Sequence, residues 1–145
     1  MARFGCGVLT TTAANITLPA MGLYNSASVV AALREVGISN TSSTACAFMI
    51  SLVTTVGTKV STPTEVKHRD NGPLSEVDAV TWSAGPTIGA TLGYRQQLGA
   101  AVGAGVIWTF GGDGLQCAVG TANALAIATS DTTAQNVHAY MVWDE

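Results

Sequence analysis

Residues 137–143 read Val-His-Ala-Tyr-Met-Val-Trp, so apolar side chains take every second position of this stretch. Successive side chains of a β-strand point to opposite sides, and a period of two is typical of a strand with one face in the core. We therefore expect Met141 and Trp143 on the core side and His138 on the opposite side. Residues 106–110, Val-Ile-Trp-Thr-Phe, alternate in the same way and predict a second core strand.

Turn-forming residues recur about every ten positions elsewhere in the chain, and short runs rich in Val, Ile, Thr and aromatic residues lie between them. The turn signals are Gly57, Asn71-Gly72-Pro73, Gly85-Pro86, Gly111-Gly112-Asp113-Gly114 and Ser130-Asp131-Thr132. The further runs are 8–18, 47–55, 77–82 and 124–129. Runs of this length and spacing favour an all-β sandwich or barrel of antiparallel strands.

Two segments fit no single period. Ser28 can cap a helix that runs to residue 35, yet residues 34–38 also alternate, so we expect a strand over 28–38, with a helix as the alternative. Residues 93–105 combine the helix-favouring 95–98 with three glycines that weaken a helix. We expect that segment to be irregular, with at most one turn of helix.

The composition points to a surface that partners cover. Only 10% of the 145 residues are charged and 48% are hydrophobic, whereas about a quarter is charged in a typical soluble domain. Large uncharged surface marks interaction sites. Six Lys plus Arg against nine Asp plus Glu, scattered singly, make no basic stripe, so we expect no direct contact with nucleic acid. The length suits one domain.

Export and membrane insertion are not expected from the sequence. The residues after Met1 lack the apolar core and cleavage site of a secretory signal, which predicts synthesis in a cytoplasm. The longest uncharged apolar run, 98–110, contains three glycines and is shorter than the roughly 20 residues of a membrane helix.

The three cysteines predict neither a disulfide framework nor a zinc site. Cys6, Cys46 and Cys117 are odd in number, far apart and form no CxxC pair. Cys46 and Cys117 lie in strand-like runs, and we expect them to be buried and inert. Cys6 lies near the N-terminus, where we expect a mobile and reactive thiol.

Catalytic chemistry has a weak basis in this sequence. The best group of titratable residues is Glu65, His68 and Asp70, which share a charged stretch typical of a solvated loop. The glycines of 99–105 are not followed by Lys-Ser/Thr, as a phosphate-binding loop requires. We expect a protein that is not an enzyme and binds no cofactor or metal.

From about Ser28 onward, short segments of glycine, turn and aromatic residues follow one another in a particular order. These segments are Glu35-Val36-Gly37-Ile38, Leu52-Val53-Thr54-Thr55 with Gly57-Thr58, Leu92-Gly93-Tyr94-Arg95, the stretch 98–111, Gly120-Thr121-Ala122-Asn123-Ala124, and Tyr140-Met141-Val142-Trp143-Asp144-Glu145. In the order of these segments the chain resembles small virion structural proteins of tailed bacteriophages.

The resemblance implies a single-domain β-sandwich of jelly-roll type that sits on a phage particle. Its implied role is capsid decoration, or cementing, in which the protein stabilises the shell by binding the major capsid protein. A neck or tail role is the alternative. Threefold points on a phage shell favour a homotrimer, and the expected location is the virion.

Residues 1–27 contain none of the segments that carry this resemblance, so we expect an extended N-terminal arm ahead of a sandwich over 28–145. The arm is expected either to be part of the same domain or to be ordered by contact with a neighbouring subunit or the shell. Trp82 and Tyr94 also leave open a carbohydrate-binding module, in which they would be stacking platforms. The candidate contact residues are Arg3, Phe4, Val8, Leu9, Ile16 and Leu18 in the arm, with Trp82, Tyr94 and Arg95 in the sandwich.

Overall fold

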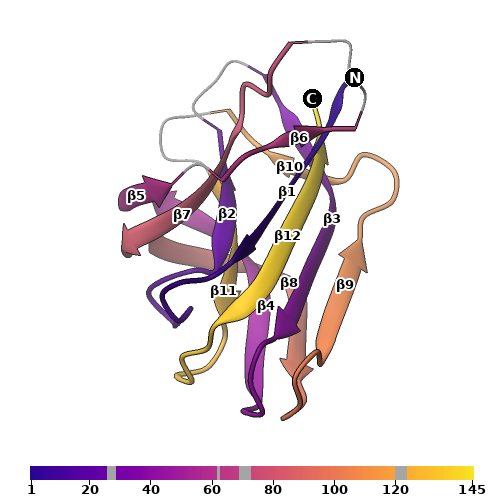
Figure 1. The fold of residues 1–145 in the computed structure, drawn as a ribbon. Coiled ribbons are helices and arrows are strands. Elements are labelled where there is room, and N and C mark those ends of the chain that lie inside the picture. Colours follow the sequence, from indigo (N-terminus) through magenta and orange to yellow (C-terminus); the bar gives the residue numbers. More distant parts are fainter. Residues whose placement is uncertain (26–28, 62, 69–72, 120–123) are drawn as a thin grey trace.

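The computed structural model describes residues 1–25, 29–61, 63–68, 73–119 and 124–145, and these residues form an all-β sandwich of two antiparallel sheets (Figure 1). The first sheet has the order β10 (Leu115–Cys117), β3 (Ala31–Asn40), β12 (Val137–Asp144), β1 (Arg3–Leu9), β6 (Val66–Lys67), with β9 (Gly105–Thr109) also paired to β3. The second has the order β5 (Thr58–Ser61), β7 (Asp78–Ala84), β2 (Met21–Tyr24), β11 (Ala124–Thr129), β4 (Cys46–Thr55), β8 (Thr87–Leu98). The expected β-sandwich is therefore confirmed.

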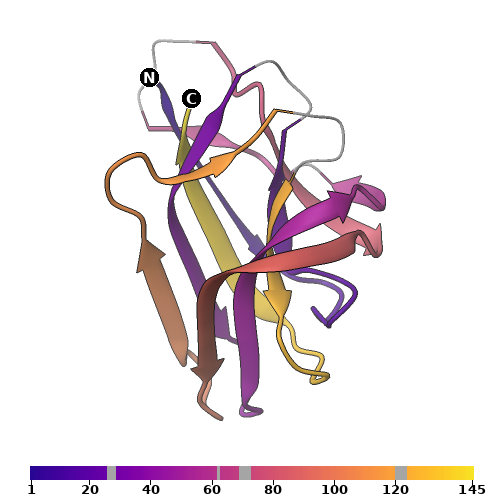
Figure 2. The same ribbon diagram turned by 180° about the vertical axis from the view of Figure 1, so that it is seen from behind.

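The chain changes sheet repeatedly as it proceeds. Strands β1 and β3 belong to the first sheet, whereas β2 and β4 belong to the second. The last strand, β12, returns to lie between β1 and β3, and it pairs with β1 along the whole of that strand. Viewed from behind, the second sheet lies in front, with β4 and β8 running side by side (Figure 2).

The main core lies between the two sheets and contains the largest buried side chains. Phe4 of β1 stacks on Trp143 of β12, with ring centroids 5.9 Å apart. The core side chains of β12 are Val137, Ala139, Met141 and Trp143, while His138 is exposed, as the alternation predicts. A second, smaller core covers the outer side of the second sheet and contains Leu18, Tyr24, Val53, Val80, Trp82, Ala124 and Ala126.

Residues 1–25 are part of the sandwich, so they belong to the same domain, and the extended arm ordered by a partner is wrong; residues 26 and 27 lie outside the described residues. Strand β1 lies between β12 and β6, and β2 lies between β7 and β11. Phe4 and Cys6 alternate with Gly5 and Gly7, and because glycine carries no side chain the alternation was hard to recognise in the sequence. The expected strand over 8–18 is also wrong, because β1 ends at Leu9.

One other expectation needs correction. Strand β8 includes residues 93–98, for which we expected irregular structure, and it passes Gly93 at a φ of 88° with register shifts against β4. Glycine tolerates this backbone conformation, which lets the strand continue.

The common face expected for Val106, Trp108 and Phe110 is confirmed, at the edge of the core. Val106 and Trp108 of β9 are partly buried against the main core, and Phe110, directly after the strand, belongs to it. Among the described strands β9 is paired only with β3, so these side chains are less covered than those of β12.

The strand expected over 28–38 is confirmed as β3, and the helix alternative is not observed in its described residues. Strands β4, β7, β11 and β12 fall close to the expected runs. No helix among the described residues has the length and apolar character to cross a membrane.

Candidate functional site

Three of the nine expected contact residues are core residues of the subunit. Phe4 is 1% exposed, Leu18 8% and Trp82 4%. The Trp82 ring lies over the backbone of Gly22, and its Nε1 donates a hydrogen bond to the Val56 carbonyl at 2.7 Å. These three side chains are therefore inaccessible to a partner.

The aromatic residues expected on the surface are also engaged within the subunit. Tyr94 is half-buried and meets Phe110 edge-on at 4.9 Å between ring centroids, and Trp108 at 6.4 Å. Trp82 is buried and presents no free ring face for a sugar, whereas Tyr94 is half-buried. The carbohydrate-binding hypothesis therefore loses Trp82, one of the two residues on which it rested.

The remaining expected contact residues are more accessible. Leu9 is 56% exposed and Ile16 51%, while Val8 is half-buried. Arg95 is exposed on β8, with Nη2 3.6 Å from the Met49 sulfur. Arg3 is exposed as well, but its guanidinium is paired with Asp144. The structure does not bring all nine residues together on one surface.

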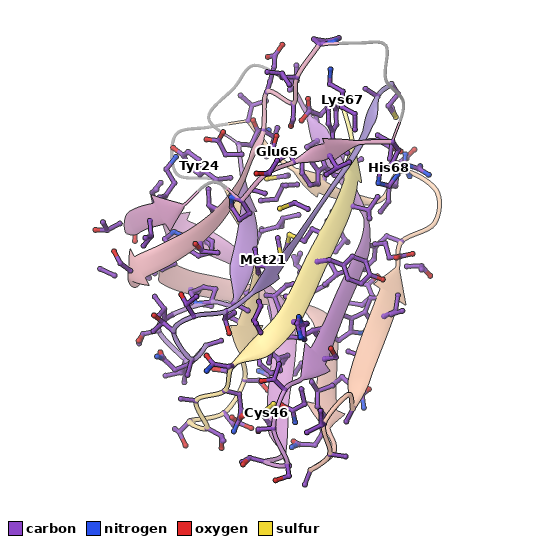
Figure 3. The ribbon with its side chains drawn as sticks, in the orientation of Figure 1. Met21, Tyr24, Cys46, Glu65, Lys67 and His68 are labelled. Carbon is purple, nitrogen blue, oxygen red and sulfur yellow. The ribbon has the colours of Figure 1, made fainter. Side chains whose placement is uncertain are left out.

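The candidate catalytic residues lie apart. Glu65 and His68 lie toward opposite ends of β6 (Figure 3), and Asp70 is outside the described residues. The Glu65 carboxylate accepts a hydrogen bond from the Ala79 amide at 2.8 Å, and burial raises the pKa of Glu65 above its usual value. The His68 ring lies against Gly5, because a Cβ added to Gly5 would be 2.9 Å from His68 Nε2. Glu65 and His68 thus have separate structural surroundings.

All three thiols are buried. Burial raises the pKa of Cys6, Cys46 and Cys117 to about 11. This agrees with the expectation for Cys46 and Cys117. The expected mobility and reactivity of Cys6 are wrong, because its side chain belongs to the main core.

The outer surface of β1, β12, β3 and β9 carries a feature that the sequence analysis missed. We call this surface the glycine face. Its positions form three cross-strand rows, in the order Gly5, Val142, Glu35, Thr109; Gly7, Tyr140, Gly37, Ile107; and Leu9, His138, Ser39, Gly105. Four of these twelve positions are glycine. The alternation of Gly5 and Gly7 with core residues is a signal in the sequence, but the rows exist only once the four strands pair.

A shallow hollow of about 830 Å³ lies over the second and third rows of this face. Its floor includes Gly7, and Leu9 and Ile107 stand on it as exposed apolar side chains, 56% and 62% exposed. Tyr140 lies flat over Gly37, where an added Cβ would be 2.0 Å from the Tyr140 Cε1. A smooth, apolar surface of this kind suits contact with another protein surface.

Tyr140 is held in this position by a hydrogen bond. Its hydroxyl donates to Glu35 Oε1 at 2.7 Å. Burial, followed by this hydrogen bond, raises the pKa of Tyr140 to about 12. The ring therefore stays neutral and forms part of the apolar floor at physiological pH.

Comparison with known proteins adds no relative: the chain matches no family model, no curated protein and no solved structure.

Proposed function

We propose that this chain is a non-enzymatic structural protein of a tailed-bacteriophage particle that decorates the capsid. The observation that carries the proposal is the glycine face, a shallow apolar surface made from rigid paired strands instead of loops. Such a surface supports assembly, because it gains hydrophobic free energy by burial and loses little conformational entropy on binding. The low charge of the whole chain supports the same proposal.

We further assign the sandwich to the jelly-roll type. What supports this is the strand order. Four strands follow one another as β1, β12, β3, β9 in one sheet and as β2, β11, β4, β8 in the other. Each of the first four strands along the chain lies in the opposite sheet to its predecessor, so the chain wraps around the core as a jelly roll does. Strands β5 to β7 are then an insertion between β4 and β8.

For attachment to the shell we propose the exposed side of β8 around Arg95. Arginine is enriched at protein interfaces, and this residue lies on the second sheet, away from the glycine face. We expect Arg95→Glu to weaken binding of the purified protein to capsids that lack it by at least tenfold. Gln116→Glu, at an exposed position of β10 in the other sheet, is the matched control and should change binding less than threefold.

The role on the particle is tested on the phage whose genome encodes the chain. Mass spectrometry of purified particles should detect the protein, and cryo-electron microscopy should place the sandwich on the capsid surface in a fixed ratio to the major capsid protein. Density at the neck or tail would establish the alternative role. Absence of the protein from purified particles would overturn the proposal altogether.

A further inference from the structure

The second and third rows of the glycine face have a complementary distribution of large and small residues. In the second row Gly7 occupies one end and Ile107 the other. In the third row the order is reversed, with Leu9 at the first end and Gly105 at the other. Neighbouring strands lie about 4.8 Å apart, so the large and small residues of a row are about 14 Å apart.

A second copy placed on this face can use that distribution. Consider a two-fold axis that runs parallel to the strands, in the plane of contact and between β12 and β3. It exchanges β1 with β9 and leaves each row opposite itself. Ile107 of one copy then faces Gly7 of the other, and Leu9 faces Gly105. The two most exposed apolar side chains of the face meet its two exposed glycines.

The other in-plane two-fold axis, perpendicular to the strands, places each strand opposite itself. Centred on the second row, it would bring Ile107 against Ile107 of the second copy and Gly7 against Gly7, and both the collision and the void are unfavourable in a packed interface. Centred between the second and third rows, it would instead place Ile107 opposite Gly105 and Leu9 opposite Gly7. The two placements that match large residues with small ones therefore differ in the residue that faces Ile107, and variants at positions 7 and 107 distinguish them.

Charge does not oppose the pairing. Across the three rows the carboxylate is that of Glu35, which accepts the hydrogen bond from Tyr140, and the imidazole is that of His138. With the axis parallel to the strands, Glu35 faces Val142 and His138 faces Ser39, so no two like charges are opposed. Depletion of charge at the centre is typical of protein interfaces.

We propose that the glycine face is the surface through which two copies of this chain form a two-fold symmetric dimer. The inference rests on the proposed function only in taking this face as an assembly surface. It replaces the homotrimer expected from the sequence, because this contact joins equivalent surfaces and closes with two subunits.

The size of the face sets the expected strength of the dimer. Four strands and three rows span roughly 19 Å by 20 Å, on the order of 400 Å² in projection. A standard stable interface buries about 800 Å² of accessible surface per partner. We therefore expect a dimer that dissociates in the micromolar range.

Sedimentation equilibrium of the purified full chain between 1 µM and 1 mM tests this directly. The mass should rise from 14.7 kDa toward twice that value. We expect Ile107→Asp to raise the dissociation constant at least tenfold. Val60→Asp is the matched control, because Val60 is 60% exposed on β5 of the other sheet, and it should leave the dissociation constant within threefold.

Exchanging the residues at positions 7 and 107, which face each other between the two copies, tests the direction of the two-fold axis. A Cβ on Gly7 would lie 3.5 Å from the Tyr140 Cβ, an ordinary contact, so the folded subunit has room for the first side-chain atom of Gly7→Ile at this exposed position. It should weaken the dimer at least tenfold by filling the space that receives Ile107. Combining it with Ile107→Gly should restore at least part of the lost affinity, because a large residue again faces a small one.

Chemical cross-linking gives a second measure of the same contact. The double variant Gly7→Cys with Ile107→Cys should yield a covalent dimer with a thiol-specific cross-linker of about 10 Å reach, the spacing of two stacked sheets, since the two positions face each other between copies but are about 14 Å apart within one. Circular dichroism of each variant verifies that the subunit is folded.

Four outcomes would overturn the proposal: a monomer at 1 mM, a mass of three subunits, equal effects of Ile107→Asp and Val60→Asp, or folded exchange and cysteine variants that stay monomeric. All of these measurements use the purified chain alone. Absence of the protein from phage particles would therefore overturn the proposed function while leaving the dimer established.

Discussion

Arg3 and Asp144 form a bidentate ion pair that joins the first strand to the last. The Arg3 Nε lies 2.7 Å from Asp144 Oδ1, and Nη2 lies 2.9 Å from Oδ2. Arg34 of β3 donates to the same carboxylate, with its Nε 2.7 Å from Oδ2. The hydrogen bond from Arg3, with further help from Arg34, lowers the pKa of Asp144 below its usual value. One carboxylate thus connects three neighbouring strands.

We expect Asp144→Asn to lower the free energy of unfolding at pH 7 by about 1.5–3 kcal/mol, the range for hydrogen bonds to a charged group. The value should fall at the lower end because water screens the exposed Arg3. Urea unfolding measures this, with Asp113→Asn in an exposed turn as the control. Equal stability of the two variants would contradict the role of the ion pair.

The same ion pair predicts a pH dependence. Because the pKa of Asp144 is lower in the folded state, its stabilisation is present above the unfolded value of about 3.9 and is lost as the pH falls through the folded value. The difference in unfolding free energy between wild type and Asp144→Asn should be constant from pH 7 to pH 5 and shrink below about pH 4. A difference that persists unchanged to pH 2 would contradict it.

The first strand should be indispensable for folding. Phe4→Ala removes a buried ring that stacks on Trp143, and we expect a loss of about 3–5 kcal/mol in urea unfolding. Leu9→Ala, at an exposed position of the same strand, should change stability by no more than about 0.5 kcal/mol. Deletion of residues 1–9 should leave the chain unfolded. A deletion variant with native circular dichroism would show that the sandwich does not need β1.

The thiols should be unreactive until the protein unfolds. With pKa values of about 11, only about a thousandth of each thiol is ionised at pH 8, and the thiolate is the nucleophile. A thiol-specific reagent should label none of the three in the native state and all three in denaturant. Rapid native labelling of Cys6 would show that β1 opens readily.

These thiols also affect stability at high pH. Their pKa is raised in the folded state, so their contribution is complete below the unfolded value of about 8.5 and is lost as the pH rises toward 11. Serine at all three positions should make the unfolding free energy less dependent on pH between 9 and 11. An identical slope for the two proteins would argue against buried thiols.

Gly22 and Gly7 should respond oppositely to an added methyl group. A Cβ on Gly22 would lie 2.3 Å from the Trp82 ring and 2.7 Å from the Leu125 carbonyl oxygen, so Gly22→Ala should cost about 1–3 kcal/mol. A Cβ on Gly7 meets nothing closer than 3.5 Å, and Gly7→Ala should be neutral or slightly stabilising. Thermal unfolding compares the two. Equal effects would place Trp82 elsewhere.

Much of the fold could be predicted from local pattern. The alternation over 137–143 predicted which side of β12 is buried, and the strand over 124–129 was predicted with its observed bounds. A period of two and the chemistry of turns are local properties, so the sequence carries them directly. The strand over Arg3–Leu9 was missed because Gly5 and Gly7 carry no side chains, so its alternation could not be recognised. The strand over residues 93–98 was missed because Gly93 was expected to interrupt it, whereas glycine lets it continue.

The candidate site depended on the tertiary structure. Local sequence pattern was enough to predict that the chain is all-β, poor in charge and built from strands with one buried side. It could not predict that Trp82 is buried, because that burial follows from a second core outside the second sheet. Nor did it place Leu9 and Gly105, 96 positions apart in the chain, in one row. Register between distant strands is decided by the pairing of the whole sheet, and only that pairing turns scattered glycines into one face.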